Sequence, residues 1–154
     1  MPQKVSAGTI FKITADVPST FDTTGYDALS WTTVGEVRDF GEFGGEWANS
    51  NSKPVALRGV QKAKTSRDPG GFNLSIALDT DDAGQIIMKA GRDSATAIYA
   101  AQYLEPNGDI YYCQVLINAY KVTFGSQDSD QMANASCAVT TSATDVDWVE
   151  KLAA

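Results

Sequence analysis

Two apolar stretches joined by a short polar turn constrain the fold of this chain more than any other feature. Residues 97–104 (AIYAAQYL) and 110–117 (IYYCQVLI) flank the sequence EPNGD. Because Asn107-Gly108 favours the positive φ angles of a tight primed turn, the two stretches predict an antiparallel hairpin. Both are apolar at nearly every position, so we expect the core to cover one face and a helix or another subunit to cover the other.

Further strands are expected along the rest of the chain. In residues 72–78 (FNLSIAL), Phe72, Leu74 and Ile76 alternate with smaller or polar residues, the period-two pattern of a half-buried strand. Strands are also expected at residues 9–14, 31–38, 57–65, 119–124 and 135–141. The total is about eight strands.

One helix is expected at about residues 81–91. Apolar residues there recur at the spacing of one helical face. Asp79 or Asp81 is expected to cap its start, and Gly91 its end. The pattern predicts a mainly β fold, either a β-sandwich or a partly rolled barrel with this helix on one flank, in a single domain of residues 1–154.

The connection at residues 39–56 is too long for an ordinary hairpin loop. It contains Phe40, Phe43 and Trp47 among glycines, followed by a run of Asn and Ser. Structureless loops of this length are usually functional or disordered, and aromatic residues disfavour disorder. We therefore expect an extended loop whose aromatic side chains are covered by something.

The residue types disfavour an enzyme. The chain has no His, which excludes Ser-His-Asp and Cys-His catalysis and His-based zinc sites. Glu36, Glu42 and Glu46 are the remaining candidates for paired acid-base chemistry, but three carboxylates on or beside a loop are more typical of solvated side chains. We expect no catalytic residue.

Acidic and Gly-rich segments do not match metal or phosphate motifs. If Asp79 began a calcium loop of the EF-hand type, Gly84 would fill position six, but Ala90 would replace the glutamate of position twelve. The acidic run at 79–82 fits a helix start better, because carboxylates favour the positive end of the helix dipole. GEFGG and DPGG lack the context of a phosphate-binding loop. No metal and no cofactor is expected.

The charge balance disfavours nucleic acid and membrane partners. There are 12 Lys and Arg against 19 Asp and Glu, a net charge of −7, and no cluster of basic residues is evident. Neither a spanning apolar segment nor an N-terminal signal sequence is expected, so the chain is predicted to be soluble. Cys113 and Cys137 lie in apolar runs that suit reduced side chains, and a single disulfide between them stays open.

Four segments together resemble the tail tube proteins of long, flexible-tailed bacteriophages. They are WTTVGEVRDFGEFG (31–44), KAKTSRDPGG (62–71), the helix start DDAGQ (81–85), and the NGD hairpin that leads into Tyr111-Tyr112. The similarity spans nearly the whole chain in order. It implies a β-sandwich or barrel with one flanking helix, in subunits that form hexameric rings and stack into a conduit for DNA.

The resemblance also implies partners and interface residues. Residues 39–56 sit where family members carry a loop that reaches a neighbouring subunit or ring, and residues 1–8 form a candidate N-terminal arm. The expected interface residues are Phe40, Phe43, Trp47, Val55 and Leu57. The expected partners are further copies of the chain and other tail components, in the virion tail, after assembly in the host cytoplasm. DNA would pass an acidic lumen without specific binding.

Two other functions stay open. The chain is also compatible with a ring-forming tube component of a contractile injection or secretion machine, which has a similar fold. The second alternative is a β-sandwich module whose aromatic loop binds a carbohydrate or a peptide, because aromatic rings stack on sugars.

Overall fold

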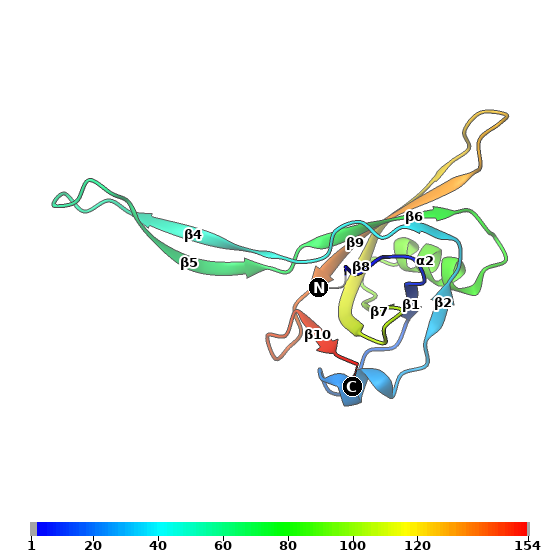
Figure 1. The fold of residues 1–154 in the computed structure, drawn as a ribbon, viewed down its shortest axis with the longest axis horizontal. Helices are drawn as coiled ribbons and strands as arrows, with labels where there is room; N and C mark the ends of the chain where they lie inside the picture. Colours follow the sequence, from blue (N-terminus) through cyan, green and yellow to red (C-terminus); the bar gives the residue numbers. More distant parts are fainter. Residues whose placement is uncertain (1–2, 154) are drawn as a thin grey trace.

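The structure is a computed structural model that describes residues 3–153 as a rolled antiparallel sheet with two helices and a projecting hairpin (Figure 1). The elements in chain order are β1 (Ile10–Thr14), α1 (Thr23–Asp27), β2 (Thr32–Val34), β3 (Val37–Asp39), β4 (Glu46–Ser52), β5 (Gln61–Asp68), β6 (Gly71–Ala77), α2 (Ala83–Asp93), β7 (Tyr99–Leu104), β8 (Ile110–Thr123), β9 (Met132–Thr140) and β10 (Trp148–Lys151).

The main sheet rolls until its two edges approach each other. Its strands follow the order β2-β1-β7-β8-β9-β6-β3, and β10 pairs with β8 outside this path. The edge strands β2 and β3 are joined only by residues 35–36, so the chain itself draws the two edges together. The expected mainly β fold, a sandwich or partly rolled sheet with a helix, is confirmed.

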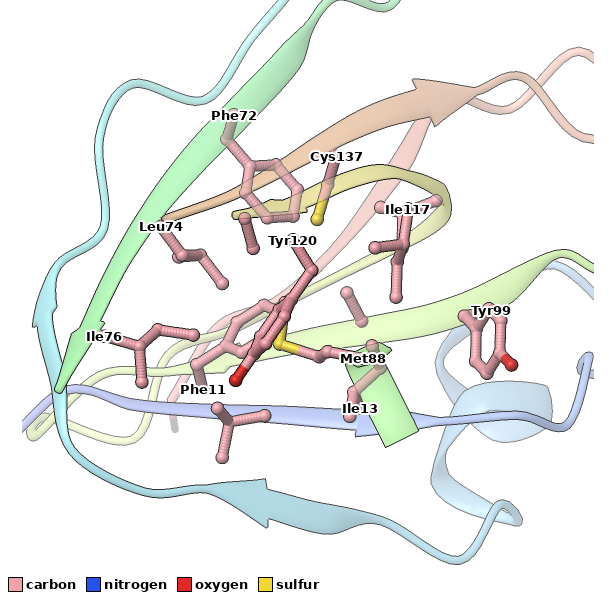
Figure 2. Close-up of a cluster of buried hydrophobic side chains, with 14 of the residues drawn as sticks. Phe11, Ile13, Phe72, Leu74, Ile76, Met88, Tyr99, Ile117, Tyr120 and Cys137 are labelled. Carbon is pink, nitrogen blue, oxygen red and sulfur yellow. The ribbon is translucent and has the colours of Figure 1, made fainter. Parts of the chain in front are cut away.

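The inner side of the rolled sheet holds the core. Phe72, Leu74 and Ile76 point inward from β6, as the alternation in FNLSIAL predicts, and meet Phe11 from β1 (Figure 2). Helix α2 packs against β8, β2 and β1 and inserts Met88 among these side chains. Burial of this apolar area is the main source of stability, at about 25 cal/mol per Å².

The β7–β8 hairpin forms where the two apolar stretches predict it, and both of its faces are covered within the chain. On the face away from the core, Ala100 and Tyr112 pack with Tyr26 of α1, a helix that the sequence pattern does not predict. The turn differs from the expected two-residue form. The N–H of Glu105 donates to the carbonyl oxygen of Asp109 at 2.9 Å, so this pair closes a loop of three residues, 106–108. Gly108 adopts a positive φ of 94°, which is the usual Gly position in a three-residue hairpin.

Helix α2 begins and ends slightly later than predicted. Asp82 is the N-cap, and its carboxylate accepts from the backbone N–H of Gln85 at 3.0 Å, whereas the Asp79 carboxylate accepts from the N–H of Asp81. Gly91 does not end the helix. It lies inside the last turn, where a Cβ would stand 2.8 Å from Ile117 and 2.9 Å from Tyr99, so close packing explains this glycine.

A buried glutamine closes the seam between the two sheet edges. The side-chain amide of Gln85 donates to the carbonyl oxygens of Gly35, in the β2–β3 link, at 3.2 Å and of Ala77, at the end of β6, at 3.0 Å. Its carbonyl oxygen accepts from the N–H of Asp79 at 3.0 Å and from the hydroxyl of Tyr120 at 3.1 Å. All four hydrogen-bonding positions of the amide are therefore used, which is what its burial requires.

We expect Gly84→Ala to destabilise the fold by about 2 kcal/mol, because α2 packs on the β2 backbone at this position. A Cβ there would stand 2.5 Å from the carbonyl oxygen of Thr33 and 2.6 Å from the Cα of Val34. Calorimetry should show a melting temperature lower by about 4–8 °C. The matched control is Gly59→Ala, whose Cβ meets nothing within 4 Å; an equal loss in both variants would contradict the packing account.

The described N-terminal segment is tied to the chain's own body. Lys4 donates to Glu105 at 3.0 Å and to Asp109 at 2.8 Å, and Asp109 also accepts from the N–H of Ala153 at 2.8 Å. Residues 1–2 of the expected N-terminal arm lie outside the described residues. Docking of the N-terminal residues 1–8 on a neighbouring subunit stays a prediction.

The Asp109 contacts predict a stability change in acid. The N–H of Ala153 and the ammonium of Lys4 lower the pKa of Asp109 to about 2. Because this pKa is depressed in the folded state, the stabilisation is complete above the unfolded value of about 3.9 and is lost as the pH falls toward 2. Melting temperatures of wild type and Asp109→Asn should therefore differ at pH 6 and converge near pH 2. A constant difference across this range would exclude the carboxylate as the cause.

Candidate assembly surface

A two-stranded hairpin projects far from the rolled sheet, toward the left in Figure 1. Strands β4 and β5 pair antiparallel from Glu46 and Asp68 at the root to Ser52 and Gln61 near the tip, and form a sheet of their own. Nearly every residue of both strands is exposed. An isolated hairpin of this kind gains little from burial and is marginal in water without a partner. We call residues 45–70 the arm.

The arm replaces most of the extended loop expected at residues 39–56. The Asn-Ser run at 49–52, which suggested turns, lies in β4 and pairs with residues 61–64 of β5. Asn and Ser have low strand propensity, but cross-strand pairing decides the conformation here. What projects is therefore a two-stranded ribbon, with one register shift between Trp47 and Asn49, whose two outer backbone edges face away from its own pairing.

Aromatic and ionic contacts hold the root of the arm. Trp47 on β4 lies beneath two cations of β5, with Lys64 Nζ 5.5 Å and the Arg67 guanidinium 5.4 Å from its ring. Arg67 also forms ion pairs with Asp147 and, at 3.0 Å, with Asp145, both in the segment before β10. The side chain of Trp47 remains 44% exposed. These contacts fix the direction in which the arm leaves the body.

The tip of the arm, residues 53–60, displays apolar side chains. Val55 is fully exposed, and Leu57 and Val60 are about half exposed. Val55 and Leu57 are two of the expected interface residues; Val60, which follows the Arg58-Gly59 pair, is a third that the sequence pattern did not single out. Apolar side chains at the end of a projecting ribbon contribute nothing to the chain's own core, which favours a partner that covers them.

The expected interface residues separate into two groups. Val55, Leu57 and Trp47 lie on the arm, whereas Phe40 and Phe43 are half-buried against the body. Figure 1 places the segment between β3 and β4 along the sheet, and ring centroids lie 5.7 Å apart for Phe40 and Tyr103 and 6.0 Å apart for Phe43 and Phe72. The chain's own core therefore covers much of these two rings. Their role in an interface stays a prediction.

The arm concentrates positive charge, which corrects the expectation that the chain has no basic cluster. Residues 45–70 contain five Lys and Arg and two Asp and Glu, so the arm carries +3 and the remainder of the chain −10. From 47 to 66 there are four basic residues and no acid: Lys53, Arg58, Lys62 and Lys64. They are scattered in the sequence, and the hairpin brings them onto one ribbon.

The carboxylates weighed for acid-base chemistry occupy separate elements. Glu36 is in the β2–β3 link and pairs with Arg38 at 3.2 Å, Glu42 is in the β3–β4 connection, and Glu46 begins β4. Within residues 3–153 no three acidic or sulfur side chains gather in a way that could hold a metal ion. Neither helix of that range has the length and apolarity needed to cross a bilayer.

Both cysteines are free and buried, so the disulfide left open by the sequence does not form. Cys113 lies in β8 and Cys137 in β9, and both belong to the core. Burial raises the pKa of the Cys137 thiol to about 12 and also raises that of Cys113. The thiols are therefore unreactive in the folded chain.

Solved structures share this fold at very low sequence identity. A chain of the anti-feeding prophage baseplate, determined with six-fold symmetry, superposes with a TM-score of 0.66 at 6% identity and covers 91% of this chain and 93% of its own. A chain from the tail of an empty GTA particle with C6 symmetry gives 0.59 at 12% identity, over 94% and 95%.

A third likeness is partial. A chain of the phage p2 baseplate in its activated conformation gives a TM-score of 0.51 at 14% identity; this chain is covered over 91% of its length but spans only 45% of that one. The sequence matches no protein-family model, and no curated protein matches it significantly. At these identities the likeness concerns the fold.

Proposed function

We propose that this chain is a structural subunit of a phage tail or a related tail-like machine, which self-associates into hexameric rings that stack into a tube. The observation that carries the proposal is the arm. A domain with a complete core of its own extends a 26-residue ribbon (45–70) that the core does not need, with apolar side chains at its tip. Such an element is best explained by contact with another copy of the same chain.

The fold likeness supports this assignment. Two of the similar chains come from assemblies described with six-fold symmetry, a prophage baseplate and the tail of a GTA particle. The two-stranded arm has unpaired backbone edges, and covering such edges by neighbouring copies in a closed ring would prevent uncontrolled association. The resemblance of the sequence to tail tube proteins of flexible-tailed phages points to the tube itself.

This function requires no catalytic residue, metal or cofactor in the chain. A conduit must let DNA slide, and the −10 charge outside the arm would repel the phosphates of a duplex over about 8–10 Å. We propose a non-enzymatic protein of the virion tail, assembled in the host cytoplasm with itself and with other tail components.

A tube or ring component of a contractile machine is the second candidate. The chain with a TM-score of 0.66 comes from a baseplate, so the shared fold is compatible with this candidate as well. A carbohydrate- or peptide-binding module is less well supported. Phe40 and Phe43 are half-buried against the chain's own core, so these two rings are not free to stack on a ligand.

Sedimentation velocity over a wide range of protein concentration tests the proposal. We expect the 16.4 kDa chain to be converted into large, regular species as the concentration rises. Discrete hexamers that never elongate would favour the contractile-machine component. A monomer at every concentration, also after other tail components are added, would contradict self-assembly.

A further inference from the structure

An apolar groove lies at the end of the body opposite the arm. In Figure 1 the arm projects to the left, whereas α2 and the turn between β8 and β9 lie at the right. The groove is lined by α2, by the segment that precedes it and by the end of β8, and has a volume of about 540 Å³. A surface at one end and a projection at the other are the two halves of a head-to-tail contact.

The lining of the groove includes two large apolar side chains that the body leaves exposed. Ile86, on the outer face of α2, is 54% exposed, and Phe124, just beyond β8, is 70% exposed. Leu78 and Val122 complete the apolar lining, and the buried Tyr120 contributes to its wall. Two large apolar side chains left exposed in the lining of one groove favour a protein contact.

Charges around the groove are mixed, with an acidic surplus in the adjoining loops. Lys89 and Arg92 line the groove on the helix side, but Arg92 is paired with Asp93 at 2.7 Å. Asp79 lines the groove too, and the loops that continue from its lining residues, 79–82 and 125–131, also carry Asp81, Asp128 and Asp130. A docking element with an apolar tip and positive charge would complement this surface.

We propose that the groove formed by Leu78, Ile86, Val122 and Phe124 receives the tip of the arm of a second copy. The inference rests on the proposed self-assembly and specifies its contact. The tip offers Val55, Leu57 and Val60 to the apolar lining, and the arm carries four basic residues and no acid between 47 and 66. Each copy would thus bind one neighbour with its arm and another with its groove, so the contact repeats along a stack.

One other cavity competes as the receptor. Beside the root of the arm, Phe40, Tyr103, Tyr111 and Trp148 line a cavity of about 370 Å³ together with Glu105. It also suits a basic side chain, through cation–π contacts. The groove is favoured because it lies at the end of the body opposite the arm, so each copy would carry the arm at one end and its receptor at the other (Figure 1).

Cysteine cross-linking distinguishes the two receptors. Leu57→Cys protein is mixed with Phe124→Cys protein, allowed to assemble, oxidised mildly, and analysed on a non-reducing gel. A covalent dimer is expected from the mixture, and a ladder of multimers from a chain that carries both changes. Because Cys113 and Cys137 are buried in the core, wild type should give no ladder.

The matched comparison is Leu57→Cys mixed with Trp148→Cys, which places the second thiol in the aromatic cavity. Cross-linking there, in assembled protein that shows none with Phe124→Cys, would overturn the groove while leaving self-assembly intact. Wild-type protein that never assembles would instead refute the proposed function.

Charge reversal gives an independent measurement. Lys53→Glu with Arg58→Glu should raise the concentration needed for assembly about tenfold, and Asp81→Lys with Asp128→Lys should restore it in the same chain. Asp16→Lys, an exposed acid in the β1–α1 connection, should not restore it. If the arm reversal leaves assembly unchanged but abolishes binding to a 20-base-pair duplex in fluorescence anisotropy, the arm is a nucleic-acid ribbon and the groove is not its partner.

Discussion

Shortening the arm should abolish assembly and leave the subunit folded. Trp47 and Arg67 are paired residues, so residues 48–66 can be replaced by Asn-Gly, which closes a two-residue hairpin at that point. The truncation removes the apolar tip and the four basic residues but keeps the ion pairs of Arg67 with Asp145 and Asp147. Because the removed residues are almost all exposed, little buried area is lost, and the melting temperature should change by no more than a few degrees.

A milder variant separates the tip from the length of the arm. Val55→Ser with Leu57→Ser keeps the ribbon and removes only its apolar end, and assembly should be greatly weakened. Val17→Ser is the matched control, since Val17 is also an exposed valine but lies on the body. Light scattering of wild type, the double serine variant and Val17→Ser at equal concentration measures the effect. Normal assembly of the truncated chain would show that the arm is not an assembly element.

Replacing Gln85 by Leu should be the most destabilising single change in the body. Leu fills a similar volume, but it leaves the carbonyl oxygens of Gly35 and Ala77 and the N–H of Asp79 without the partner they have now. Each buried polar group left unsatisfied costs about 1–3 kcal/mol, so a total loss of about 4 kcal/mol is expected. For a domain of this size the melting temperature should fall by about 8–16 °C.

The matched control is Gln61→Leu, the same substitution at an exposed position of β5. It should change the melting temperature by no more than about 2 °C. Hydrogen exchange adds a second readout, because opening of the seam in Gln85→Leu should increase exchange of the Ala77 N–H, which donates to the carbonyl of Glu36. Equal stability of the two variants would contradict the role of Gln85 in joining the sheet edges.

The parts of the fold that follow simple periodicity could be predicted from the sequence. Residues 72–78 alternate strictly, and β6 covers all of them but Leu78; the apolar runs on both sides of Asn107-Gly108 lie in β7 and in the first part of β8. Helix α2 was predicted from its apolar spacing. In each of these segments the side-chain pattern and the tertiary environment favour the same conformation, which is why local reasoning succeeds.

Elements that depend on distant partners could not be predicted in the same way. β4 consists mostly of polar, turn-favouring residues and becomes a strand only because β5 pairs with it. β10 is a short strand that pairs with the first half of β8, and α1 has only five residues. Strand pairs far apart in sequence leave no periodic signal in either strand alone, so propensity underestimates them.

Five interface residues were expected from the sequence, and the structure shows only where they lie, so their role stays a prediction. Trp47, Val55 and Leu57 lie on the arm, whereas Phe40 and Phe43 pack on the core, a separation that composition cannot reveal. Arg58, Lys62, Lys64 and Arg67, within ten residues that contain no acid, were a usable signal of an exposed basic segment. The groove beside α2 combines residues from three separate segments, so only the structure brings it together.

Electron microscopy of the concentrated, purified protein tests the central claim most directly. Self-assembly predicts particles of uniform width with a central channel, in which averaged end views show six-fold symmetry and the arm-shortened variant shows none of them. Images that contain only monomers at every concentration, for wild type as well as for the shortened chain, would contradict the claim that the arm exists to join copies of this protein.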